Sequence, residues 1–270
     1  PDMLPTTSPR YVGKAVQRIE DPGLVAGTVE FIDNYSVPGM AHAAILRSPH
    51  PHARVVSVDA SAAEQLPGVY AVLTGDDVKA WCNPAVTSPE GWGAYCLAVG
   101  KARFVGEPVA AVAAVSRYVA EDALELIEVE YDVLPVVRNP EDAVAEGAPI
   151  LFEENKTNVL QDRKYTWGEV DRVFAEADHV FTEKFRWNRC GANPMETFGC
   201  VCQWDTVDNN LTIRGSYQAP GLIALGRAGA LNLPTSKVKV HSHPHGGSFG
   251  GKGGPRATDI AALLSRKSGG

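Results

Sequence analysis

The sequence of 270 residues has no long apolar run. No window approaches the roughly 18 uninterrupted apolar residues of a membrane helix, and the N-terminal "PDMLPTTSPRYVGK" has no apolar signal-peptide core. Cysteines number five and form neither a C-x-x-C pair nor a zinc or iron–sulfur ladder. The net charge of −7, with dispersed basic residues, argues weakly against a nucleic-acid partner. We therefore expect a soluble, cytoplasmic chain in a reducing compartment, with no iron–sulfur cluster of its own.

What the sequence does contain is ordinary globular material, 44% apolar and 21% charged, enough for one large or two medium domains. The first half has short apolar runs broken by turns, and one run, "EPVAAVAAVS", is apolar almost throughout, as in a strand buried on both faces. An extended arm (1–20) is predicted to precede an α+β domain (21–137). Its predicted elements are strands at 40–48, 53–59, 69–75, 107–116 and 128–137, and helices at 60–67 and 117–127.

The second half begins with a polar, proline-bearing connector at 138–165. Residues 166–270 alternate strands and helices and end on a strand, a glycine loop and a helix. A sheet rarely closes at such a point, so we expect more polypeptide to complete this fold. Its predicted elements are a helix at 170–177, a strand at 178–188, a hairpin at 199–218, a glycine-weakened helix at 219–234, a strand at 237–243 and a helix at 258–270.

The stretch "HSHPHGGSFGGKGG" approaches the phosphate-binding pattern G-x-x-x-x-G-K-[ST], because Gly246 and Gly251 have the required interval and Lys252 follows. Gly253, however, occupies the place of the hydroxyl that binds Mg²⁺, and no acidic Walker-B-type strand follows. Four glycines around Phe249 instead allow positive φ angles and bring backbone N–H groups close to a ligand. We interpret the stretch as a turn built for close approach.

Three histidines, His241, His243 and His245, alternate and would share one face of a strand, which suggests a metal site. Pro244 interrupts the alternation, and no acidic partner lies nearby in the sequence. Solvent-facing or turn-stabilising histidines are therefore the favoured interpretation.

Glu196 and the cysteines Cys200 and Cys202 could each have either a chemical or a structural role. Glu196 lies beside Asn193 in "NPMETFGC" and could be a buried base, although a structural carboxylate is the default. Cys200 and Cys202 would share one face of a strand, and without a third ligand we expect buried core cysteines.

The glycine stretch resembles the G-G-x-F-G-x-K loop of the molybdenum hydroxylases, the xanthine dehydrogenase and aldehyde oxidase family. "GSYQAP" (215–220), followed by a helix and "LNLPTSKVKV", resembles the family segment whose glutamine approaches the metal. The stretches from "PGMAHAAILRSPHPHARVVSVDA" to "YDVLPVV" are similar to the family's hammerhead domain. The resemblance covers residues 10–270, with two motif sets in the expected order. It implies an α+β hammerhead domain followed by the first part, 166–270, of a molybdenum-cofactor-binding α+β domain.

The resemblance also implies roles for individual residues. Gln218 matches the glutamine that hydrogen-bonds an oxygen ligand of molybdenum, and Phe249 and Gly250 match loop residues beside the metal. The Gly250 N–H would donate to a metal oxo group. A neutral donor stabilises such an oxygen without adding charge. The remaining loop residues implied to hold the pterin are Gly246, Gly247 and Ser248.

Two departures qualify the resemblance. Xanthine-oxidising members have a substrate-binding glutamate after the loop lysine, where this chain has Gly253, so a purine substrate is not implied. The family's general base is a glutamate near the end of a much longer chain, beyond this sequence. We therefore expect another polypeptide to supply the rest of the molybdenum subunit, the chain being either one part of a split subunit or a fragment.

The expected function is hydroxylation of an electron-poor carbon, such as that of an aldehyde or N-heterocycle, with oxygen from water. The cofactor implied is a molybdenum pterin in its cytosine dinucleotide form, and the electrons would pass to iron–sulfur and FAD subunits. The alternative is a non-catalytic interaction or maturation protein that keeps the hammerhead domain.

Overall fold

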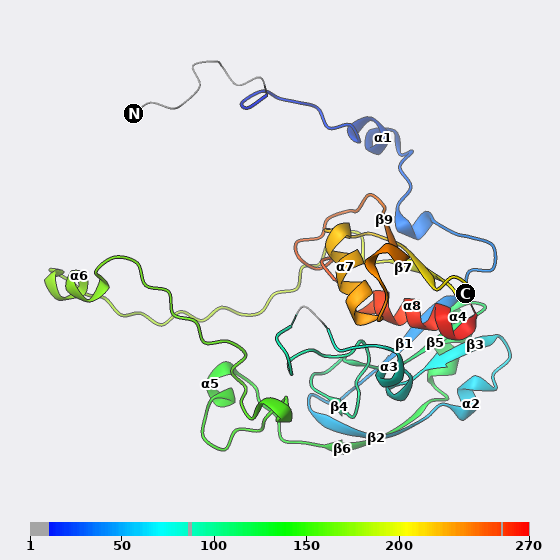
Figure 1. Ribbon diagram of the computed structural model, residues 1–270, viewed down its shortest axis with the longest axis horizontal. Helices are drawn as coiled ribbons and strands as arrows, with labels where there is room; N and C mark the ends of the chain where they lie inside the picture. The colour runs from blue at the N-terminus through cyan, green and yellow to red at the C-terminus, as the bar shows by residue number, and fades with distance from the viewer. Residues whose placement is uncertain (1–10, 86–87, 255, 270) are drawn as a thin grey trace.

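A computed structural model describes residues 11–85, 88–254 and 256–269. Its packed body consists of two halves, from which two segments extend (Figure 1). The first is the N-terminal segment with α1 (Asp21–Ala26), and the second contains α6 (Val170–Glu176). In the described part of the chain, no helix has the length and apolarity needed to cross a bilayer.

The first half contains two three-stranded sheets in which every pairing is antiparallel. One has the strand order β1-β5-β3 and the other β4-β2-β6. The strands are β1 (His42–Arg47), β2 (Ala53–Asp59), β3 (Val69–Leu73), β4 (Lys101–Ala102), β5 (Pro108–Ala114) and β6 (Glu128–Val133).

The central strand β5 is buried along its whole length, as its continuous apolar run predicts. Helix α4 (Arg117–Leu124) packs against it through small buried side chains such as Ala120, and α2 (Ser61–Glu64) packs against β3 and α4. The Ser116 side chain caps α4 by accepting a hydrogen bond from the backbone N–H of Val119. Small side chains at this contact let the helices approach the sheet closely.

The second half is a three-stranded sheet of order β7-β8-β9 with two long helices. Strands β7 (Cys200–Asp205) and β8 (Asn210–Gly215) form the predicted antiparallel hairpin. Helix α7 (Pro220–Ala230) then crosses to β9 (Val238–Ser242), which runs parallel to β8. Helix α8 (Ala257–Ser268) follows the glycine stretch.

Helix α8 lies between the two halves (Figure 1) and packs against β7 on one side and β3 and β5 on the other. One hydrophobic cluster therefore contains Leu73 from the first half and Trp204 and Leu263 from the second. The chain thus buries a shared core across the halves. Shorter elements are η1 (Ile32–Asn34), α3 (Gly75–Trp81), α5 (Pro140–Ala143), η2 (Glu153–Asn155) and η3 (Thr235–Lys237).

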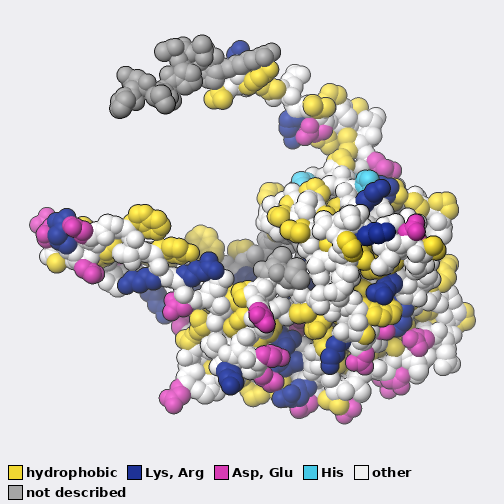
Figure 2. All heavy atoms as spheres, viewed as in Figure 1, with side chains coloured by type: hydrophobic (Ala, Val, Ile, Leu, Met, Phe, Trp, Pro, Cys, Tyr) yellow, Lys and Arg dark blue, Asp and Glu magenta, His cyan; other side chains and the backbone are white. Residues whose placement is uncertain are grey.

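The strand predicted at 178–188 does not form, and that prediction is wrong for this structure. The segment belongs to the extension around α6, on which Figure 2 shows hydrophobic side chains at the surface. Phe181, Phe185 and Trp187 are among the exposed side chains. Alternation of apolar residues favours a strand, but a strand needs a neighbour for its backbone hydrogen bonds. None lies beside this segment in the described part of the chain.

Candidate functional site

The glycine loop (243–254) joins β9 to α8, and Gln218 follows the end of β8. Because β8 and β9 are parallel, their carboxyl ends lie at the same edge of the sheet. Residues that follow these two strands are therefore brought together, although about thirty positions separate them in the sequence. Such an edge is where α/β sheets commonly bind ligands.

Gln218 and the loop make two hydrogen bonds. The Gly250 N–H donates to Gln218 Oε1 at 3.1 Å, and the Gln218 N–H donates to the carbonyl of Lys252 at 3.2 Å. Accepting from an N–H identifies the amide oxygen, so the Nε2 group is the free end of the side chain. Gln218 is exposed and Nε2 has no protein partner in the described residues, so this neutral donor is available to a ligand.

The loop backbone requires its glycines. Gly247 and Gly250 have φ angles of 92° and 90°, and Phe249 itself has a φ of 48°. A Cβ on Gly246 would lie 2.8 Å from Glu196 Cβ, closer than real contacts allow. The sequence therefore specifies this turn sterically, at the first glycine as well as at those with positive φ.

Three successive loop amides, those of Gly247, Ser248 and Phe249, have no hydrogen-bond acceptor among the residues that the structure describes. Consecutive free N–H groups in a turn form a concave site for anionic or oxygen-rich groups. The Phe249 side chain, 77% exposed, stands beside them. This donor set fits a polar cofactor rich in oxygen, as the resemblance implies.

The loop lysine is buried and forms an ion pair inside the protein. Lys252 is 1% exposed, and its Nζ lies 2.6 Å from Glu196 Oε2. Glu196 Oε2 also accepts a hydrogen bond from the Gly246 N–H at 2.9 Å. A buried, paired ammonium cannot bind a nucleotide phosphate without breaking this pair, which agrees with rejecting the phosphate-loop interpretation. The same pairing supports the interpretation of Glu196 as a structural carboxylate and not as a base.

The histidines do not converge on a metal site. The His243 ring packs against Tyr35 with centroids 5.4 Å apart, and its Nδ1 lies 3.3 Å from the carbonyl of Glu30. Across residues 11–85, 88–254 and 256–269, no group of three or more His, Cys, Asp or Glu side chains could hold a metal ion. His241 and His245 are exposed, as the solvent-facing interpretation predicts, whereas His243 contacts the distant N-terminal segment and does not stabilise a local turn.

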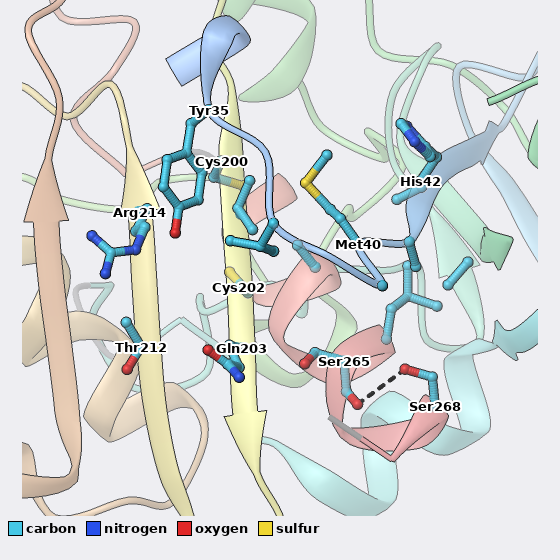
Figure 3. Close-up of a pocket in the computed structure, with 18 of the residues that line it drawn as sticks. Tyr35, Met40, His42, Cys200, Cys202, Gln203, Thr212, Arg214, Ser265 and Ser268 are labelled. Atoms are coloured by element: carbon cyan, nitrogen blue, oxygen red, sulfur yellow. Dashed lines mark hydrogen bonds between the residues drawn. The ribbon is translucent and has the colours of Figure 1, made fainter. Parts of the chain in front are cut away.

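Cys200 and Cys202 face a separate cavity of about 210 Å³ between β7, β8, α8 and the segment before β1 (Figure 3). Cys202 Sγ donates to the carbonyl of Thr258. Its hydrogen bond with Cys200, and then its burial, raise the pKa of the Cys202 thiol. Both cysteines are half-buried and pack against the edge of the shared core, so the expectation of buried core cysteines holds only in part.

Two ion pairs connect the start of α8, and the residue just before it, to the rest of the protein. Arg227 Nε lies 2.8 Å from Asp259 Oδ1, and Arg256 Nη1 lies 2.9 Å from Glu107 Oε1 in the first half. Burial raises the pKa of Asp259 to about 6, although Arg227 and Arg256 act in the opposite direction. The segment after the glycine loop is thus anchored to both halves of the body.

The role of Lys252 and Glu196 could not be found from local patterns. Their ion pair joins positions 56 apart, and neither the G-K pattern nor "NPMETFGC" identifies the other partner. The family motifs did single out Gln218 and Gly250, which the structure places in hydrogen-bond contact. Their roles toward a cofactor are addressed below.

Comparison with protein families and known proteins gives a consistent result. The aldehyde oxidase and xanthine dehydrogenase a/b hammerhead domain matches residues 26–135, and the molybdopterin cofactor-binding domain matches residues 151–270. The 6-hydroxypseudooxynicotine dehydrogenase complex subunit gamma of Paenarthrobacter nicotinovorans is 37% identical over 96% of this chain and 33% of its own length. The carbon monoxide dehydrogenase large chain of Afipia carboxidovorans is 36% identical over 92% of this chain and 32% of its own length.

Among solved structures, quinoline 2-oxidoreductase from Pseudomonas putida 86 superimposes with a TM-score of 0.85 at 37% identity, over 95% of this chain and 33% of that one. The chain therefore spans about a third of the length of these relatives. The α+β hammerhead and cofactor-binding fold predicted from the sequence is confirmed. The chain belongs to the aldehyde oxidase and xanthine dehydrogenase family of molybdenum hydroxylases, as part of the large molybdopterin-binding subunit.

Proposed function

We propose that this chain is part of a molybdenum-dependent hydroxylase and that the loop and Gln218 hold its molybdenum-pterin cofactor. The observation that carries the proposal is the contact between Gly250 and Gln218 beside three free loop amides. A non-catalytic module would have no need to combine an oriented amide with a strained, glycine-dependent turn. The interaction or maturation role therefore remains the weaker alternative.

When bound, the cofactor supplies two-electron oxidation of the substrate and the site at which oxygen from water is transferred. Gln218 donates a neutral hydrogen bond through Nε2, in the orientation that the Gly250 N–H sets. The amides of Gly247, Ser248 and Phe249 add three more donors, which have no acceptor among the described residues and so break no protein hydrogen bond when they bind a ligand. Phe249 places an apolar ring beside these donors and limits the access of water.

The hydrogen bond to Gln218 suggests a role for the Gly250 N–H other than donation to a metal oxo group, which the resemblance implied. This N–H is occupied by Gln218 Oε1 in this structure, so it orients the glutamine. Gln218 Nε2 then becomes the donor that faces the cofactor. A direct bond from Gly250 to an oxygen of the cofactor would require the glutamine amide to release this N–H.

The substrate we propose is an electron-poor carbon of an aldehyde or N-heterocycle. Two relatives act on heterocyclic compounds according to their names, 6-hydroxypseudooxynicotine dehydrogenase and quinoline 2-oxidoreductase. Gly253, an exposed residue without a side chain, offers no carboxylate to a purine. This supports a substrate other than xanthine.

The remaining two thirds of the relatives' length would supply the general base and much of the substrate pocket. We propose that this polypeptide, together with iron–sulfur and FAD subunits, completes a cytoplasmic complex. The pterin would be in the cytosine dinucleotide form, and acid hydrolysis of its pyrophosphate bond would release CMP.

An isotope experiment tests the reaction. The natively purified complex is incubated in H₂¹⁸O with an N-heterocycle, which has no exchangeable oxygen at the reacting carbon, and an electron acceptor over many turnovers. We expect product with one ¹⁸O atom and two electrons transferred per product. Product that is unlabelled in H₂¹⁸O but labelled in ordinary water under ¹⁸O₂ would refute the proposal.

A further inference from the structure

One carboxylate contacts the glycine loop at two positions, Gly246 and Lys252. Glu196 Oε2 accepts from the Gly246 N–H at 2.9 Å and pairs with Lys252 Nζ at 2.6 Å. The Glu196 N–H also reaches the carbonyl of Gly246 at 3.4 Å. Glu196 thus holds the first glycine and the lysine that closes the loop, so the intervening turn is fixed at both ends.

The Glu196–Lys252 ion pair is almost completely shielded from solvent. The side chains of Lys252 and Glu196 are 1% and 15% exposed. Burying a charge pair seldom adds net stability compared with well-packed apolar residues, but it selects one geometry. A pair at this place is therefore better explained by the position it sets than by the stability it adds.

The pair is connected to the proposed cofactor donor. The carbonyl of Lys252 accepts the Gln218 N–H, and Gln218 Oε1 in turn accepts the Gly250 N–H. A displacement of Lys252 would therefore move the backbone of Gln218 and change the direction of its Nε2 group. We propose that Glu196 and Lys252 are positioning residues, which fix the turn and Gln218 relative to each other. This inference rests on the proposed function only in taking Gln218 and the loop to face the cofactor.

The test uses the natively assembled protein and four variants. Lys252→Met breaks the pair and leaves a buried carboxylate. Glu196→Leu/Lys252→Met replaces both partners with apolar side chains. Lys267→Met is the control. It breaks a different ion pair, in which Lys267 Nζ lies 2.8 Å from Asp77 Oδ2, and neither residue belongs to the loop. Glu196→Gln keeps an acceptor for the Gly246 N–H and removes one charge.

Three readouts are compared: the melting temperature, hydrogen exchange of the peptide that covers 246–252, and molybdenum per chain. We expect Lys252→Met to speed loop exchange at least tenfold and to lower molybdenum content at least fivefold. The double variant should recover most of the melting temperature while its loop exchange stays fast and its molybdenum content low. A merely structural pair would instead recover all three readouts together.

Wild-type exchange and molybdenum content in the double variant would overturn the inference. If Lys252→Met fails to fold, Glu196→Gln carries the test: faster loop exchange than in Lys267→Met is expected, and an unchanged rate overturns the inference. Loop exchange can be measured whether or not molybdenum is present. A wild-type protein without molybdenum would therefore defeat the proposed function while leaving the exchange result to decide the role of the pair.

Discussion

The hammerhead half and the glycine loop are built on opposite principles. In the first half, β5 is buried along its length and consists mainly of small apolar residues, and both β5 and α4 follow from local sequence patterns. At the loop, the buried contact is an ion pair between Glu196 and Lys252, and the turn uses positive φ angles. Apolar burial supplies stability without fixing a single atom position, whereas paired charges and strained turns fix positions at a cost in stability.

The largest predicted effect is loss of the cofactor when a loop glycine is replaced, and a glycine of the first half serves as its comparison. Gly250 and Gly106 have φ angles of 90° and 87°, and an added Cβ would meet nothing within 4 Å at either. Gly250→Val and Gly106→Val should therefore cost similar backbone strain, about 1–3 kcal/mol each. Only Gly250→Val should lose the cofactor and turnover, which molybdenum analysis and activity assays measure. Full molybdenum content with unchanged turnover in Gly250→Val would break the comparison.

Next in size is the removal of the free amide. Gln218→Leu deletes the Nε2 donor at an exposed position, so we expect turnover to fall by about 100-fold or more. The free energy of unfolding should change little, because the side chain is not part of the core. Urea denaturation and steady-state kinetics on the same preparation separate the two effects. A large loss of stability with normal kinetics would assign Gln218 a structural role.

In the first half, the expected effect is on stability alone. Leu73 is fully buried where the two halves meet, so Leu73→Ala should lower the free energy of unfolding by about 2–5 kcal/mol. Tyr118→Ala, at a position 80% exposed on α4, should change it by no more than about 0.5 kcal/mol. Both variants should retain molybdenum in the fraction that remains folded. Urea denaturation provides the two values, and equal losses would contradict the assignment of the core.

The smallest effect is a pH dependence. Because burial raises the pKa of Asp259 to about 6, the folded state binds more protons than the unfolded state from about pH 4 to 6. Stability from this group is present below pH 4 and is lost as the pH rises to 6, with a slope of at most about 1.4 kcal/mol per pH unit. Asp259→Asn should remove this contribution. Urea denaturation at pH 4, 5 and 6 gives the free energy of unfolding of the wild type and of Asp259→Asn. This free energy should change differently with pH in the two proteins, and an identical pH dependence would disprove the prediction.

Much of the fold could be predicted because its elements have local causes. The strand at 53–59 is observed with these limits, and α7 forms over 220–230 despite its three glycines. The strand at 178–188 could not be judged locally, because strand formation depends on a neighbour elsewhere.

At the candidate site, the family motifs identified Gln218 and the glycine loop, while parallel pairing of β8 with β9 explains why they meet. The Glu196–Lys252 pair was missed for a physical reason. A buried ion pair between distant segments leaves no periodic signal, and each partner alone resembles an ordinary surface charge. Only the folded arrangement shows that the two neutralise each other.

The most direct test of the cofactor site is molybdenum content, measured by inductively coupled plasma mass spectrometry on natively purified protein with every co-purifying chain identified. The account predicts about one molybdenum atom per chain, together with polypeptide that supplies the rest of the large subunit. Protein that contains this polypeptide but no molybdenum would contradict the central claim that the loop and Gln218 hold a molybdenum cofactor.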